Sequence, residues 1–264
     1  VGGLYACGYS PMEIQKLYSD QPDRMLDYNW PGLVAFLLGR LFRTSVAFDG
    51  LIRGRKLGKK LQVLCEEKGL FCMADVPMPL AITAVDINTA RLILFVSKKP
   101  AYLDNDFVYN DSAEIGNAIR ASTAVPAVFC PEMIQGRRLV DGGVRDNLPA
   151  QVLRDMGATR VLAVNLGYTG ELKKDVDNIL EIANQSLDIL SYQVSQELSK
   201  AADYVLLPRI YDVSLLDMNK IDATFERGYQ ACKRHMHEIK NALGVSDGLA
   251  RPGIGQWHPE REWA

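Results

Sequence analysis

The sequence predicts an α/β fold, because short apolar runs alternate with stretches of helical spacing along most of the chain. Two of these runs, at 79–85 and 91–96, are separated only by the link 86–90, so we expect two neighbouring strands. A third run, 160–166, is rich in branched apolar residues, which is typical of a buried strand. Shorter strands are expected at 138–140 and 204–208. Strands and helices in this order favour a sheet flanked by helices.

The helices are predicted from their start and stop signals and from the spacing of leucines. Ser10 stands before Pro11 and three residues before Glu13, which is the pattern of a capped helix start. Leucines at 57, 61 and 64 repeat at helical spacing in a helix expected to end near Gly69. Further helices are expected at 112–121, 148–157, 176–200 and 225–243. We therefore expect one domain over residues 1–243 and an irregular tail over residues 244–264.

The stretch 21–53 has no regular pattern, although it is rich in apolar and aromatic residues between Trp30 and Phe42. Two interpretations are open for it, a lid and a set of helices that cap the core. We favour the helices that cap the core.

Charge and hydropathy exclude some classes of partner. The chain has 264 residues, of which 48% are hydrophobic and 23% charged, as in a globular protein with one large core. Its 30 Lys and Arg residues against 32 Asp and Glu residues give a net charge of -2, so the charge balance does not favour a nucleic acid as partner. No apolar run approaches the roughly 18 residues that a membrane-spanning helix needs.

The five cysteines are scattered and odd in number, and none forms a Cys-x-x-Cys pair. They are Cys7, Cys65, Cys72, Cys130 and Cys232. This pattern favours incidental core thiols and a reducing, cytoplasmic compartment over a disulfide framework. Export is left open, because the chain begins at Val1 and a signal peptide before it would be invisible.

The histidines offer little for metal binding or catalysis. The chain has three, His235, His237 and His258, all near its end. Residues two apart on a helix do not face each other, so His235 and His237 are not expected to share a metal. We expect no metal site.

A Gly-x-Ser-x-Gly sequence occurs at 244–248, but in the wrong context for a nucleophile. That motif needs a strand before the serine and a helix after it. Here it follows a helix and enters the tail, so Gly244 is expected to cap the helix and Ser246 to lie in a loop.

Asp141 is the strongest catalytic candidate, because the expected strand 138–140 delivers it into Gly142 and Gly143. A carboxylate at a strand end can act as a general base when burial raises its proton affinity. Taken alone, however, Asp-Gly-Gly is more often a turn that closes a strand. The residues of this motif leave both interpretations open.

Two sequence blocks around Asp141 resemble the second half of the patatin-like phospholipase domain. The first runs from Ala118 to Pro131 and contains Ala-Ser-x-x-x-Pro at 121–126; the second is Asp-Gly-Gly at 141–143, followed by Asn-Leu-Pro at 147–149. Residues 1–11 also resemble the helix that follows the serine of this family and the turn after it. The resemblance extends to about residue 243, and the tail is unmatched.

The resemblance implies a three-layer fold with a central, mainly parallel sheet flanked by helices. It also implies that Asp141 is the base of a Ser-Asp dyad that works without histidine, metal or organic cofactor. Gly142 and Gly143 would then set the backbone approach to this base. Ser122 and Pro126 would shape the neighbouring turn.

The family's glycine-rich oxyanion loop and its serine both precede the point where this chain begins. By this alignment the serine lies a few residues upstream of Val1, so the 264-residue chain alone is expected to be inactive and poorly stable.

The function implied by the resemblance is hydrolysis of a phospholipid or another lipid acyl ester. Peripheral contact with a membrane or with acyl chains, through the apolar residues between Trp30 and Phe42, is a secondary expectation beside core packing. The alternative from another class is a non-catalytic pseudoenzyme or a lipid-binding or interaction module. A triad hydrolase that uses one of the late histidines is a lesser alternative.

Overall fold

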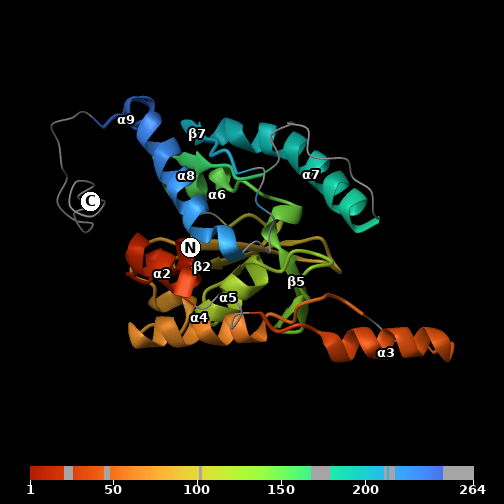
Figure 1. The fold of residues 1–264 in the computed structure, drawn as a ribbon. Helices are drawn as coiled ribbons and strands as arrows, with labels where there is room; N and C mark the ends of the chain where they lie inside the picture. Colours follow the sequence, from red (N-terminus) through yellow and green to blue (C-terminus); the bar gives the residue numbers. More distant parts are fainter. Residues whose placement is uncertain are drawn as a thin grey trace.

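The computed structural model describes residues 1–20, 26–44, 48–100, 103–167, 179–210, 213 and 218–245 (Figure 1). The expected tail lies outside these residues except for its first two positions, so the domain boundary at 243 stays a prediction. His258 and Ser246 also lie outside the described residues, so the expectations for them stay predictions.

A five-stranded sheet in the order β3-β2-β1-β5-β4 forms the centre of the fold. Its strands are β1 (Ala81–Asp86), β2 (Leu92–Val96), β3 (Phe107–Asn110), β4 (Glu132–Ile134) and β5 (Arg137–Asp141). The two runs predicted as neighbouring strands do pair, as β1 and β2, in the register Ile82 with Phe95. The α/β fold with a central sheet flanked by helices is therefore confirmed.

The expectation of a mainly parallel sheet is wrong for this part of the molecule. Strand β1 is antiparallel to both β2 and β5, and β4 is antiparallel to β5, whereas only β2 and β3 run parallel among the described strands of this sheet. The cause is local, because tight turns reverse the chain direction. Gln135 and Gly136, both with positive φ, join β4 to β5, and Ala90, also with positive φ, lies in the turn between β1 and β2.

Nine helices are described, with the bounds α1 Gly2–Ala6, α2 Pro11–Asp20, α3 Trp30–Leu41, α4 Arg55–Glu67, α5 Ile115–Ser122, α6 Ala150–Asp155, α7 Ile179–Leu198, α8 Ile221–Arg234 and α9 Met236–Leu243. The predicted capped start of α2 is confirmed, since the Ser10 amide donates to Glu13 and the Glu13 amide donates to the Ser10 hydroxyl. The single helix expected at 225–243 is two helices that meet at His235.

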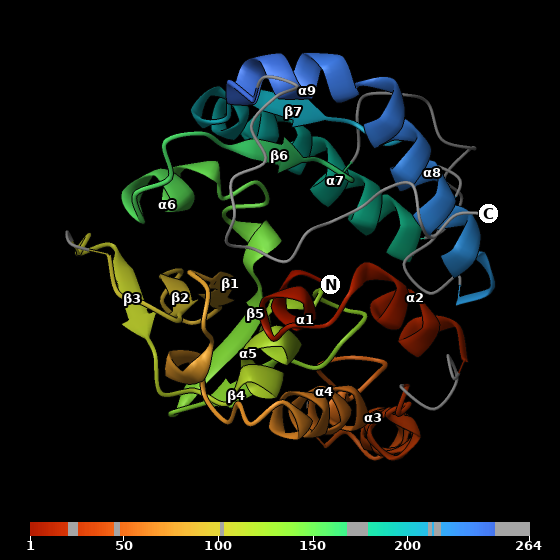
Figure 2. The same cartoon turned by 90° about the vertical axis from the view of Figure 1, so that its left-hand side faces the viewer.

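Helices cover both faces of the sheet. Alternate residues of the strands, such as Ile82 and Phe95, pack against α1 and α5 in the larger core cluster. The intervening residues, such as Leu94 and Val140, pack against Val152 of α6. Figure 2 shows α5 and α4 on one side of the strands and α6 on the other. The three layers thus follow from the two-residue alternation of apolar side chains along the strands.

The strand expected to be buried, 160–166, is short and half exposed. It forms β6 (Leu162–Val164), which pairs in parallel with β7 (Tyr204–Leu206) in a separate two-stranded sheet. Val164 and Leu166 are both exposed. The prediction of a buried strand was wrong because, among the described strands, β6 has a partner on one edge only.

Helix α3 corrects a further expectation, since its large apolar side chains do not cap the core. Val34, Leu37 and Leu41 are exposed, and the helix runs outward from the body of the molecule (Figure 1). None of the helices in the described ranges is long and apolar enough to cross a membrane.

Candidate active site

Asp141 is the last residue of β5 and lies opposite Ala84 of β1. Strand alternation places it on the same face as Leu139, which packs in the cluster formed with α1 and α5. Its backbone amide donates to the Ala124 carbonyl at 3.0 Å, so the loop after α5 is fixed against the end of β5. The Ala-Ser-x-x-x-Pro block and the Asp-Gly-Gly block are thus neighbours in space.

Burial raises the pKa of Asp141 above the usual value of an aspartate, and a hydrogen bond opposes this shift only in part. In that hydrogen bond the Gly143 amide donates to Oδ1 of Asp141 at 2.8 Å. The same contact makes Asp141 the cap of the short 3-10 helix Gly142–Val144. The carboxylate therefore has a structural role in the turn, together with the raised proton affinity that suits a general base.

Close packing requires a glycine at position 142 and leaves little room at position 143, while neither glycine has a positive φ. A Cβ on Gly142 would meet the side chain of Thr83 and would lie 2.7 Å from the Thr83 carbonyl oxygen. A Cβ on Gly143 would lie 3.2 Å from Oδ1 of Asp141. The glycines thus let the chain turn tightly beside β1 while Asp141 keeps its position.

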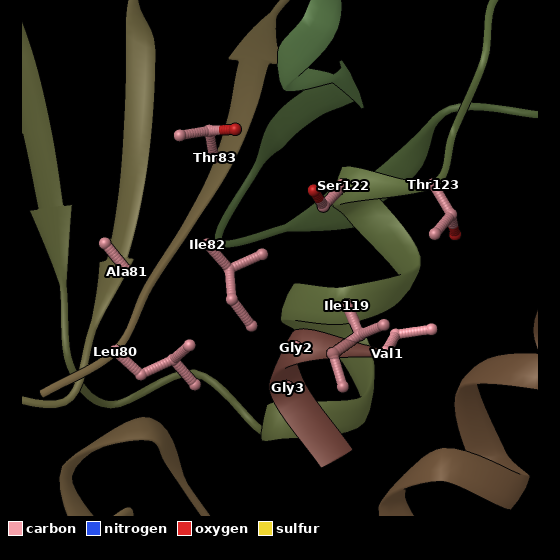
Figure 3. A pocket seen from close by; sticks show the side chains of 10 residues that line it. All are labelled: Val1, Gly2, Gly3, Leu80, Ala81, Ile82, Thr83, Ile119, Ser122 and Thr123. Atoms are coloured by element: carbon pink, nitrogen blue, oxygen red, sulfur yellow. The ribbon is translucent and has the colours of Figure 1, made fainter. Parts of the chain in front are cut away.

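A pocket of about 250 Å³ lies between α1, β1 and α5, and neither Asp141 nor the two glycines after it are among its lining residues (Figure 3). Its lining comes from three places, the start of α1 (Val1, Gly2, Gly3), β1 with the residue before it (Leu80–Thr83), and the end of α5 with the residue after it (Ile119, Ser122, Thr123). Three hydroxyl groups, from Thr83, Ser122 and Thr123, stand among the apolar side chains. Thr83 lines the pocket and also packs against Gly142, so it connects the pocket with the Asp141 turn.

Helix α1 sits tightly against the pocket wall. A Cβ on Gly3 would lie 2.7 Å from Cδ1 of Ile119, so a larger residue there would require the Ile119 side chain to move. Val1, the residue before Gly2, also lines the pocket, so the start of α1 forms part of the pocket wall.

The comparisons with known proteins decide the family. Residues 1–154, more than half of the chain, match the family model described as patatin-like phospholipase. The chain belongs to the patatin-like phospholipase family. The resemblance drawn from the two sequence blocks is thereby confirmed, and the matched range includes α1, the pocket and Asp141.

Curated relatives of this patatin-like chain come from bacteria and eukaryotes. An uncharacterised NTE family protein of Mycobacterium tuberculosis is 28% identical over 127 residues, which are 48% of this chain and 30% of the relative. The patatin-like phospholipase domain-containing protein 7 of Rattus norvegicus is 30% identical over 151 residues, 47% of this chain and 11% of the relative. A lysophospholipase of Mycosarcoma maydis is 25% identical over 139 residues, 43% of this chain and 7% of the relative. The chain thus spans less than a third of each of these proteins.

The other sequence candidates do not form a site in the described part of the patatin-like chain. His235 Nδ1 lies 3.0 Å from the Tyr204 hydroxyl, and His237 Nδ1 lies 3.2 Å from the Asn241 amide. No group of three metal-ligating side chains occurs among the described residues. Gly244 caps α9 in the left-handed conformation, as expected from its place after a helix.

Ser122 and Pro126 are half buried at the end of α5 and in the loop after it. Ser122 lines the pocket, whereas Pro126 does not. Pro126 precedes Ala127, which has a positive φ, so it lies in the turn that the resemblance implied.

Arg120 is a residue that sequence reasoning missed. It is 1% exposed, and its Nη2 donates to the carbonyl oxygens of Arg53 at 2.7 Å and Cys130 at 2.5 Å. The signal was present, since an arginine stands within the otherwise apolar sequence Ala118-Ile119-Arg120-Ala121. A buried guanidinium fixes two loops to the helix that ends at Ser122, so Arg120 supports the pocket wall.

Proposed function

We propose that the chain is the base-bearing part of a lipid acyl hydrolase with a Ser-Asp dyad, in which Asp141 is the base and the serine lies a few residues upstream of Val1. The observation that carries the proposal is the half-buried carboxyl of Asp141, with its raised pKa, on a residue that pairs with Ala84, the neighbour of the pocket residue Thr83. Membership of a phospholipase family supports the reaction class. The printed name of the lysophospholipase relative supports a phospholipid or lysophospholipid as substrate.

The proposed reaction has two halves. The serine hydroxyl gives its proton to Asp141 while its oxygen attacks the ester carbonyl, and backbone amides of the upstream glycine loop stabilise the oxyanion. Collapse of this intermediate expels the alcohol, which takes the proton from Asp141, and leaves an acyl-serine. Asp141 then accepts a proton from the water that attacks the acyl-serine, and returns this proton to the serine oxygen as the fatty acid leaves. No cofactor is needed for either half.

The apolar part of the pocket suits an acyl chain. Leu80, Ile82 and Ile119 line it, while Thr83, which carries a hydroxyl group, packs against Gly142 of the turn. A substrate with an apolar tail and a polar ester group matches this division. Peripheral contact with a membrane would bring such a substrate to the pocket.

The alternative is a non-catalytic patatin-like domain that binds lipids or other partners. It is favoured by the capping role of Asp141, whose Oδ1 already accepts a hydrogen bond from Gly143. In that case the Asp-Gly-Gly turn would be kept for structure alone.

The test compares Asp141→Asn with Asp146→Asn in a version of the protein that includes the residues upstream of Val1. Asp146 is the matched control, because it is also a half-buried carboxyl with a raised pKa, five residues along the chain. Asp141→Asn should lower the turnover of a chromogenic ester by roughly 10²- to 10⁴-fold, the usual contribution of a general base. The turnover of Asp146→Asn should stay within about tenfold of the wild-type turnover, a smaller change than the loss of a general base causes. Turnover of Asp141→Asn at the wild-type rate would refute the dyad.

A further inference from the structure

Helix α3 (Trp30–Leu41) carries large apolar side chains in solvent. Trp30, Val34, Leu37, Leu38, Leu41 and the following Phe42 are all exposed, the last two by 73% and 71%. An apolar patch of this size on a helix is unusual for a surface that meets only water. Figure 1 shows α3 extending from the body, with α4 continuing the same lower edge of the molecule.

Exposed cations stand at both ends of this apolar stretch. Arg40 and Arg43 lie at its C-terminal end, and Arg55, Lys56 and Lys59 lie on the first turns of α4. The salt bridges among the described residues involve none of these five cations. Residues 40–60 contain seven basic residues and one acidic residue, Asp49, in a chain whose net charge is -2. The positive charge is therefore concentrated around α3.

Hydrogen bonds fix the two helices relative to each other where they begin. Asn29 lies just before α3, and its backbone amide donates to the Leu51 carbonyl at 2.7 Å. The backbone amide of Arg53, just before α4, donates to the Asp27 carbonyl at 2.9 Å. The Arg53 side chain also donates through Nε to Oδ1 of Asn29 at 2.9 Å. The cations at the start of α4 are thus held close to the start of α3, on a rigid junction.

We propose that α3 and the first turns of α4 form a docking surface for a bilayer that contains anionic phospholipids. A helix of 12 residues is roughly 18 Å long, too short to cross the apolar core of a bilayer but long enough to lie in its interface. Its apolar side chains would enter the acyl boundary, and the flanking arginines and lysines would contact lipid phosphates. The purpose of this surface, delivery of a lipid substrate, rests on the proposed function. The binding of the surface to a bilayer does not.

The charge pattern favours a membrane over a second copy of this chain. A symmetric dimer formed through α3 would bring the same cations of both copies together, and like charges in an interface oppose association. An anionic bilayer instead offers phosphates around an apolar interior, which matches cations around an apolar helix.

The experiment uses Trp30 as the reporter, because the other two tryptophans, Trp257 and Trp263, lie in the tail. In the 264-residue chain with Trp257→Phe and Trp263→Phe, emission comes from Trp30 alone. Vesicles of phosphatidylcholine with phosphatidylglycerol should shift this emission to the blue and sediment the protein. Vesicles of phosphatidylcholine alone should bind it more weakly, and salt should weaken binding to the anionic vesicles.

Two double variants separate the apolar and the electrostatic contributions. Leu41→Asp with Phe42→Asp should reduce binding to the anionic vesicles by about tenfold or more. Lys56→Gln with Lys59→Gln should reduce it by about fivefold for each cation removed, with little effect on neutral vesicles. The matched control is Leu190→Asp on α7, where the leucine is 60% exposed, and it should bind like the parent. Circular dichroism checks that each variant is folded.

Equal binding by the parent and the folded Leu41→Asp, Phe42→Asp variant would overturn the proposal. So would absence of binding to anionic vesicles, or a dimer of the parent that this variant converts to a monomer. Asp141→Asn should bind vesicles like the parent, so a failure of the proposed hydrolase activity would leave this result intact.

Discussion

Asp141 is placed where structure and proposed catalysis make opposite demands on one carboxyl group. Burial raises its pKa, which suits a base but disfavours the ionised form in the folded protein. The amide of Gly143 stabilises the ionised form through one hydrogen bond and offsets part of that cost.

The pH dependence of the protein's stability should report the free-energy cost of burying the ionised carboxyl of Asp141. A raised folded pKa means that the folded protein binds the proton more tightly, so this stabilising contribution is complete below the unfolded pKa of about 4 and is lost as pH rises through the folded pKa. Asp141→Asn should therefore melt at a higher temperature than the wild type at pH 7, and the difference should shrink toward about pH 4. Thermal melts of both proteins across this range measure it. A lower melting temperature of Asp141→Asn at pH 7 would show that the hydrogen bond from Gly143 outweighs burial.

Asp141 and its glycines could be predicted from the sequence, because an Asp-Gly-Gly turn after a strand is a local pattern. Thr83 could not, because its importance comes from packing against Gly142, which is distant in the chain and adjacent only through the pairing of β1 with β5. The same pairing explains why Gly142 cannot carry a side chain.

Helix α5 is the element that connects the site to the rest of the molecule. Arg120 in its last turns donates to the carbonyl oxygens of Arg53 and Cys130, and its guanidinium lies 5.3 Å from the centre of the Phe129 ring. Gly54, which caps the start of α4, has a positive φ and leaves no room for a Cβ beside this guanidinium. The start of α4 is therefore shaped around Arg120.

Replacing Gly54 by Ala should destabilise the fold through this contact. Gly69 is the matched control, because it also has a positive φ at the end of the same helix but would place its Cβ in open space. Gly69→Ala should cost about 1–2 kcal/mol from backbone strain alone. Gly54→Ala should cost about 1–3 kcal/mol more, because it also forces the buried arginine to move. Urea unfolding measures both, and equal costs would argue against a tight fit between Gly54 and Arg120.

Elements defined by local signals followed the sequence closely. The capping pair of Ser10 and Glu13 predicted the start of α2, and Gly244 predicted the end of α9. Helix α3 does not cap the core, contrary to the expectation from its sequence. A run of apolar residues indicates that a helix has an apolar partner, but not whether that partner is the core or a lipid surface.

At the scale of the whole molecule, composition and alternation predicted an α/β sheet covered on both faces, but not its strand directions. The direction of β2 and β4 depends on two tight turns, at Ala90 and at Gln135 with Gly136, whose residues adopt positive φ. Only Gly136 gave a signal of that conformation in the sequence. The burial of β6 depends on neighbours in the sheet and could not be judged from its own residues.

The proposed hydrolase depends on a serine upstream of Val1 that works with Asp141, and the most direct test of this dyad is active-site labelling. A protein that includes the upstream residues would be treated with a fluorophosphonate, and the labelled peptide would be identified by mass spectrometry. We predict one labelled serine a few residues before Val1, and loss of labelling in Asp141→Asn but not in Asp146→Asn. A label on a serine within residues 1–264, such as Ser122 or Ser246, or full labelling of Asp141→Asn, would contradict the proposed Ser-Asp dyad.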